Sequence, residues 1–301
     1  MILILLVNWN GHEDTLACLR SLDAVQRPAF DVLVVDNASS DDSVARIRET
    51  FPAVEVLESG ENLGFTGGNN LGLEYARQHG YEYVLLLNND TEVAPDFLAP
   101  LVEALEADPQ AAAAGPLIYY HALPQVVWSA GGAIDWKRGE TRMIGLGERD
   151  EGQFDGPPRP VDFVTGCALL VRTRVLEEVG GLDERFFAYY EEVEWCLRMQ
   201  RAGYRILFVP RSKIWHKISP ERREASPRVH YYMTRNRLLF LHLGHAPLRA
   251  RLWTAFSYAR TLLSWSLKPR WRHKAPQRRA MWQAIRDYRR GRLGRCESTK
   301  V

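Results

Sequence analysis

Cysteine is scarce in this sequence: there are four in 301 residues, and none belongs to a Cys-x-x-Cys pair. The lack of paired or densely spaced cysteines excludes a zinc site of that type and a small disulfide-stapled scaffold. Glycine, at 22 residues, and proline, at 16, are too few for a collagen-like or low-complexity chain, whereas 46% hydrophobic and 25% charged residues are typical of globular proteins. We expect a cytoplasmic protein with reduced thiols at Cys18, Cys167, Cys196 and Cys296.

Long hydrophobic runs are also missing. The opening run Ile2–Val7 stops at Asn8 and has neither a positively charged start nor a small-residue cleavage site, so it predicts a buried strand rather than a signal peptide. The apolar stretch from Leu252 to Leu267 contains Arg260 and is shorter than the roughly 20 residues that cross a bilayer. We therefore expect no membrane-spanning segment.

Two nucleotide-binding fingerprints are absent. The loop after the first predicted strand lacks Gly-x-Gly-x-x-Gly, which disfavours a dinucleotide cofactor in its usual pose. The sequence has no Gly-x-x-x-x-Gly-Lys-[Ser/Thr] either, which disfavours a P-loop phosphotransferase.

Charge is unevenly distributed although the net charge is only +2. From Arg249 to Val301 there are 15 lysines and arginines against 2 acidic residues, so the rest of the chain is acidic. This basic tail also carries Trp253, Phe256 and Leu263, a combination that predicts helices lying on an anionic membrane surface. A homodimer interface is the alternative. The acidic body and the lack of a known motif argue against nucleic acid as a partner.

The first half alternates short apolar runs with helical periodicity, which predicts an α/β fold with a doubly wound, mostly parallel sheet flanked by helices. Strands are expected at Ile2–Val7, Val32–Val35, Val54–Leu57 and Tyr83–Leu87, and helices at Thr15–Leu22, Ser40–Thr50, Leu71–Gln78 and from Pro95. Later elements are a loop or irregular hairpin over the site at Glu140–Pro160, a strand at Val161–Val171, a helix from about Glu191 to Ala202, and strand or extended chain at Arg205–His216.

We divide the chain into a catalytic domain, residues 1–225, and a helical basic appendage of two or three helices, residues 226–301. Within the first part, residues 1–120 form the nucleotide-binding half and residues 121–225 the acceptor and catalytic half.

Polar clusters follow three of the predicted strands. They are Asn8-Trp9-Asn10-Gly11, Asp36-Asn37 and Asn88-Asn89-Asp90. Because ligands bind beyond the carboxyl ends of parallel strands, this edge predicts a binding site. The glycine-dense segment from Asn62 to Asn70 lets the backbone approach a ligand closely. Asp90 suits a hard divalent cation, since one carboxylate is enough when a diphosphate supplies further ligands.

These motifs, together with Asn62-Leu63-Gly64-Phe65, resemble the motif series of family 2 inverting glycosyltransferases of GT-A fold, and most closely the rhamnosyltransferase-like branch that serves bacterial surface polysaccharides. The resemblance covers about Met1–His216. One departure is that the usual Asp-x-Asp motif is Asn88-Asn89-Asp90 here. This departure weakens the expectation of metal dependence but not that of donor binding.

The resemblance implies a nucleotide-diphosphate sugar donor and a glycan or lipid-linked acceptor at the inner face of the plasma membrane. It implies Mg²⁺ or Mn²⁺ at Asp90 and His216, and an acceptor side formed by Thr165, Gly166 and Trp195. The donor-binding residues that it implies are Asn8, Trp9, Asp36, Asn37, Asn62, Gly64, Gly67, Gly68, Asn69 and Asn89.

Glu192 is the base that the resemblance implies, as the second acid of the pair Glu191-Glu192. Inversion in one displacement needs a base that takes the proton of the acceptor hydroxyl. Helical spacing also favours Glu192, because residues three, four and seven positions later form an apolar stripe, Trp195, Cys196 and Met199. We expect Glu191 and Glu194 to face solvent, with Glu194 pairing with Arg198 in water.

Several alternatives stay open at this point. Trp128 and Trp136 either stack on a sugar or pack in the core. A sugar nucleotidyltransferase has a related sheet, and a non-catalytic nucleotide-sugar-binding module is a further alternative because Asn88 replaces an acid. The sequence leaves the sugar, the base, the acceptor and the linkage undetermined.

Overall fold

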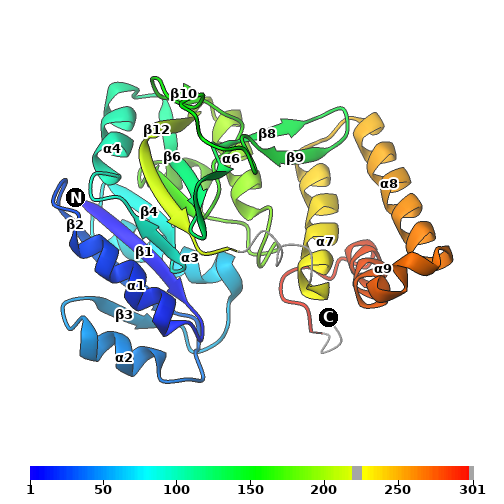
Figure 1. Ribbon diagram of the computed structural model, residues 1–301, viewed down its shortest axis with the longest axis horizontal. Helices are drawn as coiled ribbons and strands as arrows, with labels where there is room; N and C mark the ends of the chain where they lie inside the picture. The colour runs from blue at the N-terminus through cyan, green and yellow to red at the C-terminus, as the bar shows by residue number, and fades with distance from the viewer. Residues whose placement is uncertain (219–225, 298–301) are drawn as a thin grey trace.

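The computed structural model describes residues 1–218 and 226–297. A ten-stranded sheet of order β10-β12-β6-β11-β4-β1-β2-β3 forms its centre, with β5 beside β12 and β7 beside β6 (Figure 1). The strands are β1 (Ile2–Asn8), β2 (Phe30–Asp36), β3 (Glu55–Glu58), β4 (Tyr83–Asn88), β5 (Thr91–Val93), β6 (Ala111–Tyr120), β7 (Leu123–Ser129), β10 (Arg159–Pro160), β11 (Ala168–Arg172) and β12 (Arg205–His216).

The four strands predicted in the first half are confirmed. β1 pairs in parallel with both β2 and β4, and β2 pairs in parallel with β3. Alternate residues of β1 enter different cores: Ile4 and Leu6 pack on one face of the sheet, and Leu3 and Leu5 on the other. Burial on both faces explains why these strands are continuous apolar runs.

Helices cover both faces of the sheet. Residues of α1 and α4 pack in the core on one face, and residues of α3, α6 and α7 pack in the core on the other. The helices are α1 (His12–Asp23), α2 (Ser43–Thr50), α3 (Gly64–Gln78), α4 (Leu98–Ala107), α5 (Val175–Val179), α6 (Glu191–Arg201), α7 (Pro227–Leu243), α8 (Leu248–Leu267) and α9 (Ala275–Arg289), with a 3-10 helix at Pro269–Lys274.

The second half differs from prediction in two places. The strand expected at Val161–Val171 begins only at Ala168, because residues 161–167 form bends and a turn around Gly166. The resulting short strand β11 runs antiparallel between β4 and β6. The ten-residue strand β6 was not predicted. It pairs in parallel with β12, which extends to His216 as expected.

The segment Glu140–Pro160 does not cover the pocket described below. Its first residues form β9 (Glu140–Met143), which pairs with β8 (Gly132–Asp135) in a separate hairpin. This hairpin packs toward the C-terminal helices: Arg237 of α7 donates hydrogen bonds to the carbonyl oxygens of Gly139 and Arg138, at 2.7 and 2.9 Å. Trp136, between the two strands, stacks on Phe240 and is a packing residue.

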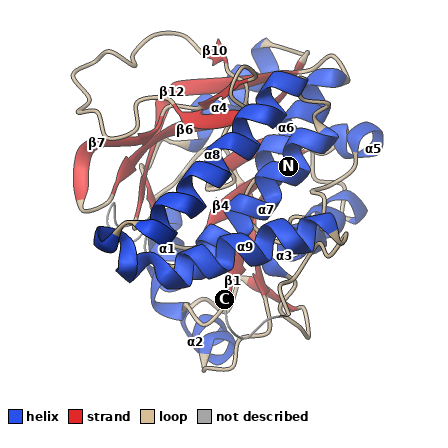
Figure 2. Cartoon of the chain, turned by 90° about the vertical axis from the view of Figure 1, so that its right-hand side faces the viewer, coloured by secondary structure: helices blue, strands red, loops and turns tan. Residues whose placement is uncertain are grey.

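Among the described residues after 226 there are three α-helices, within the two or three predicted, and they lie together at one end of the sheet domain (Figures 1 and 2). Among the described residues, no helix is both long and apolar enough to cross a membrane. The boundary at residue 225 stays a prediction, but α7 is closely joined to the preceding part, since Leu239, Phe240 and Leu241 belong to the same core as α3 and α6.

Candidate active site

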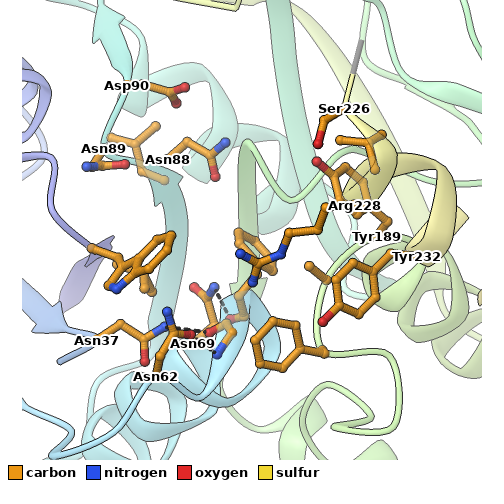
Figure 3. Close-up of a pocket in the computed structure, with 18 residues that line it drawn as sticks. Asn37, Asn62, Asn69, Asn88, Asn89, Asp90, Tyr189, Ser226, Arg228 and Tyr232 are labelled. Atoms are coloured by element: carbon orange, nitrogen blue, oxygen red, sulfur yellow. Dashed lines mark hydrogen bonds between the residues drawn. The ribbon is translucent and has the colours of Figure 1, made fainter. Parts of the chain in front are cut away.

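A cavity of about 370 Å³ opens at the carboxyl edge of β1 and β4, a size that suits a small-molecule ligand. One side is formed by Asn88, Asn89 and Asp90 after β4, and the opposite side by Ser226, Arg228 and Tyr232 from the start of α7, with Tyr189 (Figure 3). The remaining lining residues come from β1, β4, α3 and α7, from the loops after β1, β2 and β3, and from the segment before α6: Val7, Trp9, Asn37, Asn62, Gly64, Phe65, Asn69, Leu87, Phe187, Ala188 and Val229.

Seven of the residues expected in the site line this cavity: Trp9, Asn37, Asn62, Gly64, Asn69, Asn89 and Asp90. The side-chain amide of Asn37 organises its floor, donating to the Gly64 carbonyl oxygen at 2.9 Å and accepting from the Leu63 N–H at 2.8 Å. Trp9 is 48% exposed and leaves a large aromatic surface available to a base or sugar ring.

Asp36 and Asn8 do not line the cavity. Asp36 is buried and accepts hydrogen bonds from the Asn8 amide at 2.9 Å and from the N–H and hydroxyl of Ser39 at 2.9 and 2.6 Å. The Asn8 side-chain oxygen accepts from the Thr15 hydroxyl at 2.8 Å. The two residues therefore fix the loops after β1 and β2, and direct contact between Asp36 and a nucleotide stays a prediction.

Glycine is required where α3 begins. Gly64 has φ of +72°, and a Cβ on it would lie 2.5 Å from the Phe187 carbonyl oxygen. A Cβ on Gly68 would lie 2.9 Å from the Val7 side chain, which itself lines the cavity. Gly67 packs against Leu63 in the same turn. The glycines thus bring α3 close to β1 and to the segment before α6.

Asp90 and His216 lie side by side, as expected of a shared metal site. The His216 Nε2 is 3.1 Å from Asp90 Oδ1, and the imidazole is held edge-on by the buried Trp128, with ring centroids 4.6 Å apart. His216 Nδ1 is buried and has no hydrogen-bond partner among the described residues. Burial raises the pKa of Asp90, but the hydrogen bond and charge of His216, together with Lys217, lower it more, so the net pKa lies below its ordinary value. An ionised carboxylate beside an imidazole fits Mn²⁺ or Mg²⁺.

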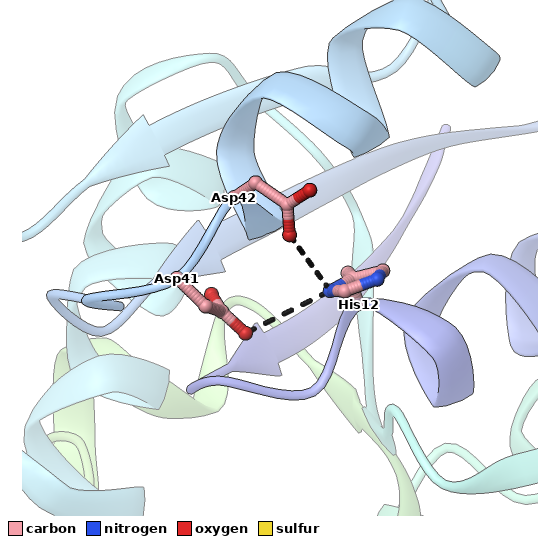
Figure 4. A group of neighbouring side chains, drawn as sticks. All are labelled: His12, Asp41 and Asp42. Atoms are coloured by element: carbon pink, nitrogen blue, oxygen red, sulfur yellow. Dashed lines mark ion pairs between the residues drawn. The ribbon is translucent and has the colours of Figure 1, made fainter.

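A second group of potential metal ligands lies outside the cavity. His12 Nδ1 is 3.7 Å from Asp41 and 3.6 Å from Asp42 (Figure 4). None of these three residues lines the cavity, and exposed acidic groups beside a histidine are common at protein surfaces without a metal ion.

Glu192 lies next to the cavity, in the first turn of α6. A Cβ built on Gly166 would lie 2.8 Å from the ring of Phe65, a lining residue, and 3.7 Å from the Glu192 Cβ. The same 165–167 turn reaches the Asp90 side, because the Asn88 N–H donates to the Cys167 carbonyl oxygen at 2.8 Å. Thr165 closes this turn by accepting the Cys167 N–H at 3.1 Å. The turn therefore connects the expected base with the expected metal site.

Burial raises the pKa of Glu192, and the backbone N–H groups of Glu192, Val193 and Gly166 partly oppose that rise. Its Oε2 is buried without a hydrogen-bond partner among the described residues. Burial and the charge of Glu192 raise the pKa of Glu191 well above its usual range. Glu191 is buried and Glu192 is half-buried with one buried carboxyl oxygen, and two adjacent carboxyl groups with raised pKa values are typical of a proton-transfer site.

The expectation that Glu191 and Glu194 face solvent is wrong. Both are buried, because the segment between α5 and α6 covers the side of α6 that was expected to be open. Glu194 does pair with Arg198, at 2.8 Å, but inside the protein, where Arg198 also donates to the carbonyl oxygens of Val179 and Gly181. This pair fixes the segment that leads into α6.

Trp195, expected on the acceptor side, lies in the core. It is fully buried, and its indole N–H donates to the Gly180 carbonyl oxygen at 2.9 Å. Cys167 and Cys196 are buried apolar fillers, as predicted, and Trp128 supports His216 rather than facing the cavity.

Two features of the cavity were missed from the sequence. Arg228 lies over the rings of Trp9, Phe187 and Tyr232, at 5.8 to 6.0 Å from their centroids.

The backbone before α6 is left-handed at Phe187, Tyr189 and Tyr190, with φ of 66°, 71° and 76°. Each such residue costs roughly 1–2 kcal/mol. Strain of this kind concentrates at functional sites.

Solved structures resemble this fold. A mannosyltransferase from Pyrobaculum calidifontis in complex with GDP-Man and Mn²⁺ matches with a TM-score of 0.59 at 16% identity, covering 95% of this chain and 86% of that one. GalNAc-T7 with UDP, GalNAc and Mn²⁺ matches with a TM-score of 0.62 at 18% identity, covering 80% of this chain and 47% of that one. The protein therefore has the GT-A fold of glycosyltransferases.

The chain belongs to glycosyl transferase family 2, whose model matches residues 4–180. It is 31% identical over 213 residues to N-acetylglucosaminyl-diphospho-decaprenol L-rhamnosyltransferase of Mycobacterium tuberculosis, covering 64% of this chain and 68% of that protein. It is 26% identical over 234 residues to the dTDP-rhamnosyl transferase RfbF of Shigella flexneri, covering 72% of each. The resemblance to rhamnosyltransferases expected from the motifs is thus confirmed.

Proposed function

We propose that this glycosyltransferase moves rhamnose from a dTDP-linked donor to a hydroxyl of a glycan or lipid-linked acceptor, with inversion. The observation that carries the proposal is the cavity at the sheet edge, where Asp90 and His216 lie on one side, Arg228 on the other, and Glu192 directly beyond Gly166. The rhamnosyltransferase relatives support the choice of sugar.

The donor diphosphate fits between Asp90 and Arg228. A divalent cation held by Asp90 and His216 would neutralise the leaving diphosphate. Arg228 offers a permanent positive charge from the opposite side, and its guanidinium group can form two parallel hydrogen bonds with phosphate oxygens. Trp9 offers a stacking face to the base or the sugar.

Glu192 acts as the base that accepts the proton of the acceptor hydroxyl. Its raised pKa makes it a stronger base than an exposed glutamate while it is ionised. Gly166 lets the Phe65 ring, which lines the cavity, pack closely beside Glu192, since a Cβ at Gly166 would lie only 2.8 Å from that ring. An acceptor hydroxyl held next to the Glu192 carboxylate would approach the sugar from the side opposite the diphosphate, as inversion requires.

Thermal shift with a panel of dTDP-, UDP- and GDP-sugars in Mn²⁺ tests the donor. We expect dTDP-rhamnose to raise the melting temperature most, because a ligand at one hundred times its Kd adds about 2.7 kcal/mol of stability. The active donor is then incubated with an acceptor, and the anomeric configuration of the product is read by NMR. Release of pyrophosphate from a sugar phosphate and a nucleoside triphosphate would instead identify a nucleotidyltransferase, and donor binding without transfer a non-catalytic module.

We further propose that α8 lies on an anionic membrane surface, close to a lipid-linked acceptor. Leu252, Phe256 and Leu263 are 60%, 58% and 59% exposed and follow helical spacing along one side of α8. Arg260 and Lys268, also exposed, supply positive charge at that helix. Tyr258 and Leu262 of the same helix face the protein instead: Tyr258 donates to the Thr234 carbonyl oxygen, and Leu262 is buried.

Cosedimentation with vesicles tests this surface. We expect the protein to bind phosphatidylglycerol vesicles and not phosphatidylcholine vesicles, and the double substitution Phe256→Ser and Leu263→Ser to weaken binding at least tenfold. Leu146→Ser, at a leucine 43% exposed elsewhere, is the matched control. Equal binding by both variants would contradict the proposal, and a dimer that only the double substitution dissociates would assign the surface to a subunit interface.

A further inference from the structure

Segment 185–190, which leads into α6, has an unusual backbone that its own residues do not favour. Phe187, Tyr189 and Tyr190 all adopt positive φ, although none is glycine, asparagine or aspartate. α6 begins immediately afterwards, and the Tyr190 carbonyl oxygen accepts the Glu194 N–H at 2.9 Å. The position of the first turn of α6, and hence of Glu192, therefore depends on how this segment is held.

Two buried side chains of α7 hold it. Asn236 Nδ2 lies 2.9, 2.7 and 2.8 Å from the carbonyl oxygens of Phe186, Ala188 and Tyr189. Arg235 donates to the carbonyl oxygens of Phe186 and Arg185, at 2.8 and 3.2 Å. Both side chains have no exposed surface.

Arg235 also determines the orientation of Asn236. Its Nε–H donates to Asn236 Oδ1 at 2.9 Å. An arginine can only donate and a carbonyl oxygen can only accept, so Asn236 must direct its NH₂ group at segment 185–190. A flipped amide would place oxygen against three carbonyl oxygens. Only one orientation of the Asn236 amide therefore satisfies these hydrogen bonds, which makes the arrangement a rigid support.

We infer that Asn236, oriented by Arg235, is a positioning residue that holds segment 185–190 in its left-handed conformation and thereby sets the location of the Glu192 carboxylate. The role of Glu192 rests on the proposed function, but the support of the segment does not. Asn236 contacts the backbone of this segment and does not line the cavity. Its loss should affect proton transfer more than donor binding, because Asp90 and Arg228, which would hold the diphosphate, lie outside segment 185–190.

The test compares Asn236→Asp with Arg237→Ala. Aspartate keeps the size of asparagine but replaces the NH₂ donor with an oxygen. Arg237 is the matched control because it is the next residue of α7 and also donates to backbone carbonyl oxygens, but to those of the β8–β9 hairpin. We expect Asn236→Asp to lower kcat for transfer about 100-fold, since a displacement near 1 Å can have that effect. We expect the donor Kd to stay within about threefold, because Phe187, Ala188 and Tyr189 of the segment line only part of the cavity and Asp90 and Arg228 lie outside the segment.

Hydrogen exchange provides a readout that does not depend on activity. Backbone amides in segment 185–190 should exchange at least tenfold faster in Asn236→Asp and at the wild-type rate in Arg237→Ala. Unchanged exchange in Asn236→Asp would overturn the inference even if the enzyme is active. Equal proportional losses of donor binding and kcat would overturn it as well, in favour of a general structural role.

If Asn236→Asp does not fold, Arg235→Lys, which loses the Nε–H that orients Asn236, is judged by the same criteria. Failure of the wild type to bind any nucleoside diphosphate would count against the proposed function alone.

Discussion

Replacement of Glu192 by glutamine is expected to lower kcat for sugar transfer by about 10²–10⁴-fold, the range that a general base contributes. Glutamine has nearly the same shape, so the buried first turn of α6 keeps its packing. The donor Kd is expected to stay near the wild-type value, because the glutamate lies beside Gly166 and does not line the cavity. Steady-state transfer kinetics and nucleotide titration measure the two quantities separately.

Glu191→Gln is the matched control. Glu191 is the adjacent residue and is buried, and burial together with the charge of Glu192 raises its pKa well above the usual range, which favours the neutral form. A neutral carboxyl and an amide are similar in size, so this substitution should change kcat only slightly. A variant pattern in which Glu191→Gln abolishes transfer and Glu192→Gln retains it would assign the base to Glu191.

The pH dependence follows from the same pKa. A general base works only when ionised, and burial raises the pKa of Glu192. The transfer rate should therefore fall as the pH drops through a value above the usual glutamate range, and this acidic limb should be absent from the residual activity of Glu192→Gln.

Replacement of Asp90 by alanine is expected to weaken nucleoside diphosphate binding roughly 10- to 100-fold, because losing a charged partner costs about 1.5–3 kcal/mol. Asp90 supplies the only carboxylate that lines the described cavity, and its lowered pKa keeps it ionised at neutral pH. Calorimetric titration of dTDP with and without Mn²⁺ measures the effect. Wild-type affinity should depend on Mn²⁺, and the affinity of the variant should not.

Asp96→Ala is the control for this substitution. Asp96 is an exposed acid just before α4 and does not line the cavity, so its loss tests a general effect of charge. An Asp90→Ala protein that binds dTDP as tightly as Asp96→Ala, with the same Mn²⁺ dependence, would remove Asp90 from the metal site.

The strands that the sequence predicted well are those buried on both faces. β1, β2 and β4 are continuous apolar runs, and such runs leave little choice of structure. β6 was missed because it begins with four alanines followed by Gly115 and Pro116, residues with low strand propensity. Its strand conformation depends on pairing with β12, whose residues lie about 90 positions later. Pairing over that distance leaves no local signal.

The site residues that local sequence patterns place were predicted equally well. Asn37, Asn62 and Asp90 follow strands or precede a helix, so local patterns placed them at one edge of the sheet. The orientation of Glu191 and Glu194 was predicted wrongly, because helical spacing shows that one side of α6 is apolar but not that the chain before α6 covers the other.

Arg228 and Asn236 were missed for a different reason. Both lie in α7, more than 100 residues after the sheet-edge motifs, and act on segments that are distant from them in the sequence. Only the consecutive polar residues Thr234, Arg235 and Asn236 inside an otherwise buried helix offered a signal, since buried polar side chains need specific partners.

A crystal structure of the protein with dTDP and Mn²⁺ tests the central claim most directly. We expect the diphosphate between Asp90 and Arg228 and the metal in contact with Asp90 and His216. Nucleotide bound outside this cavity, or a cavity that stays empty at saturating dTDP and Mn²⁺, would contradict the proposed function.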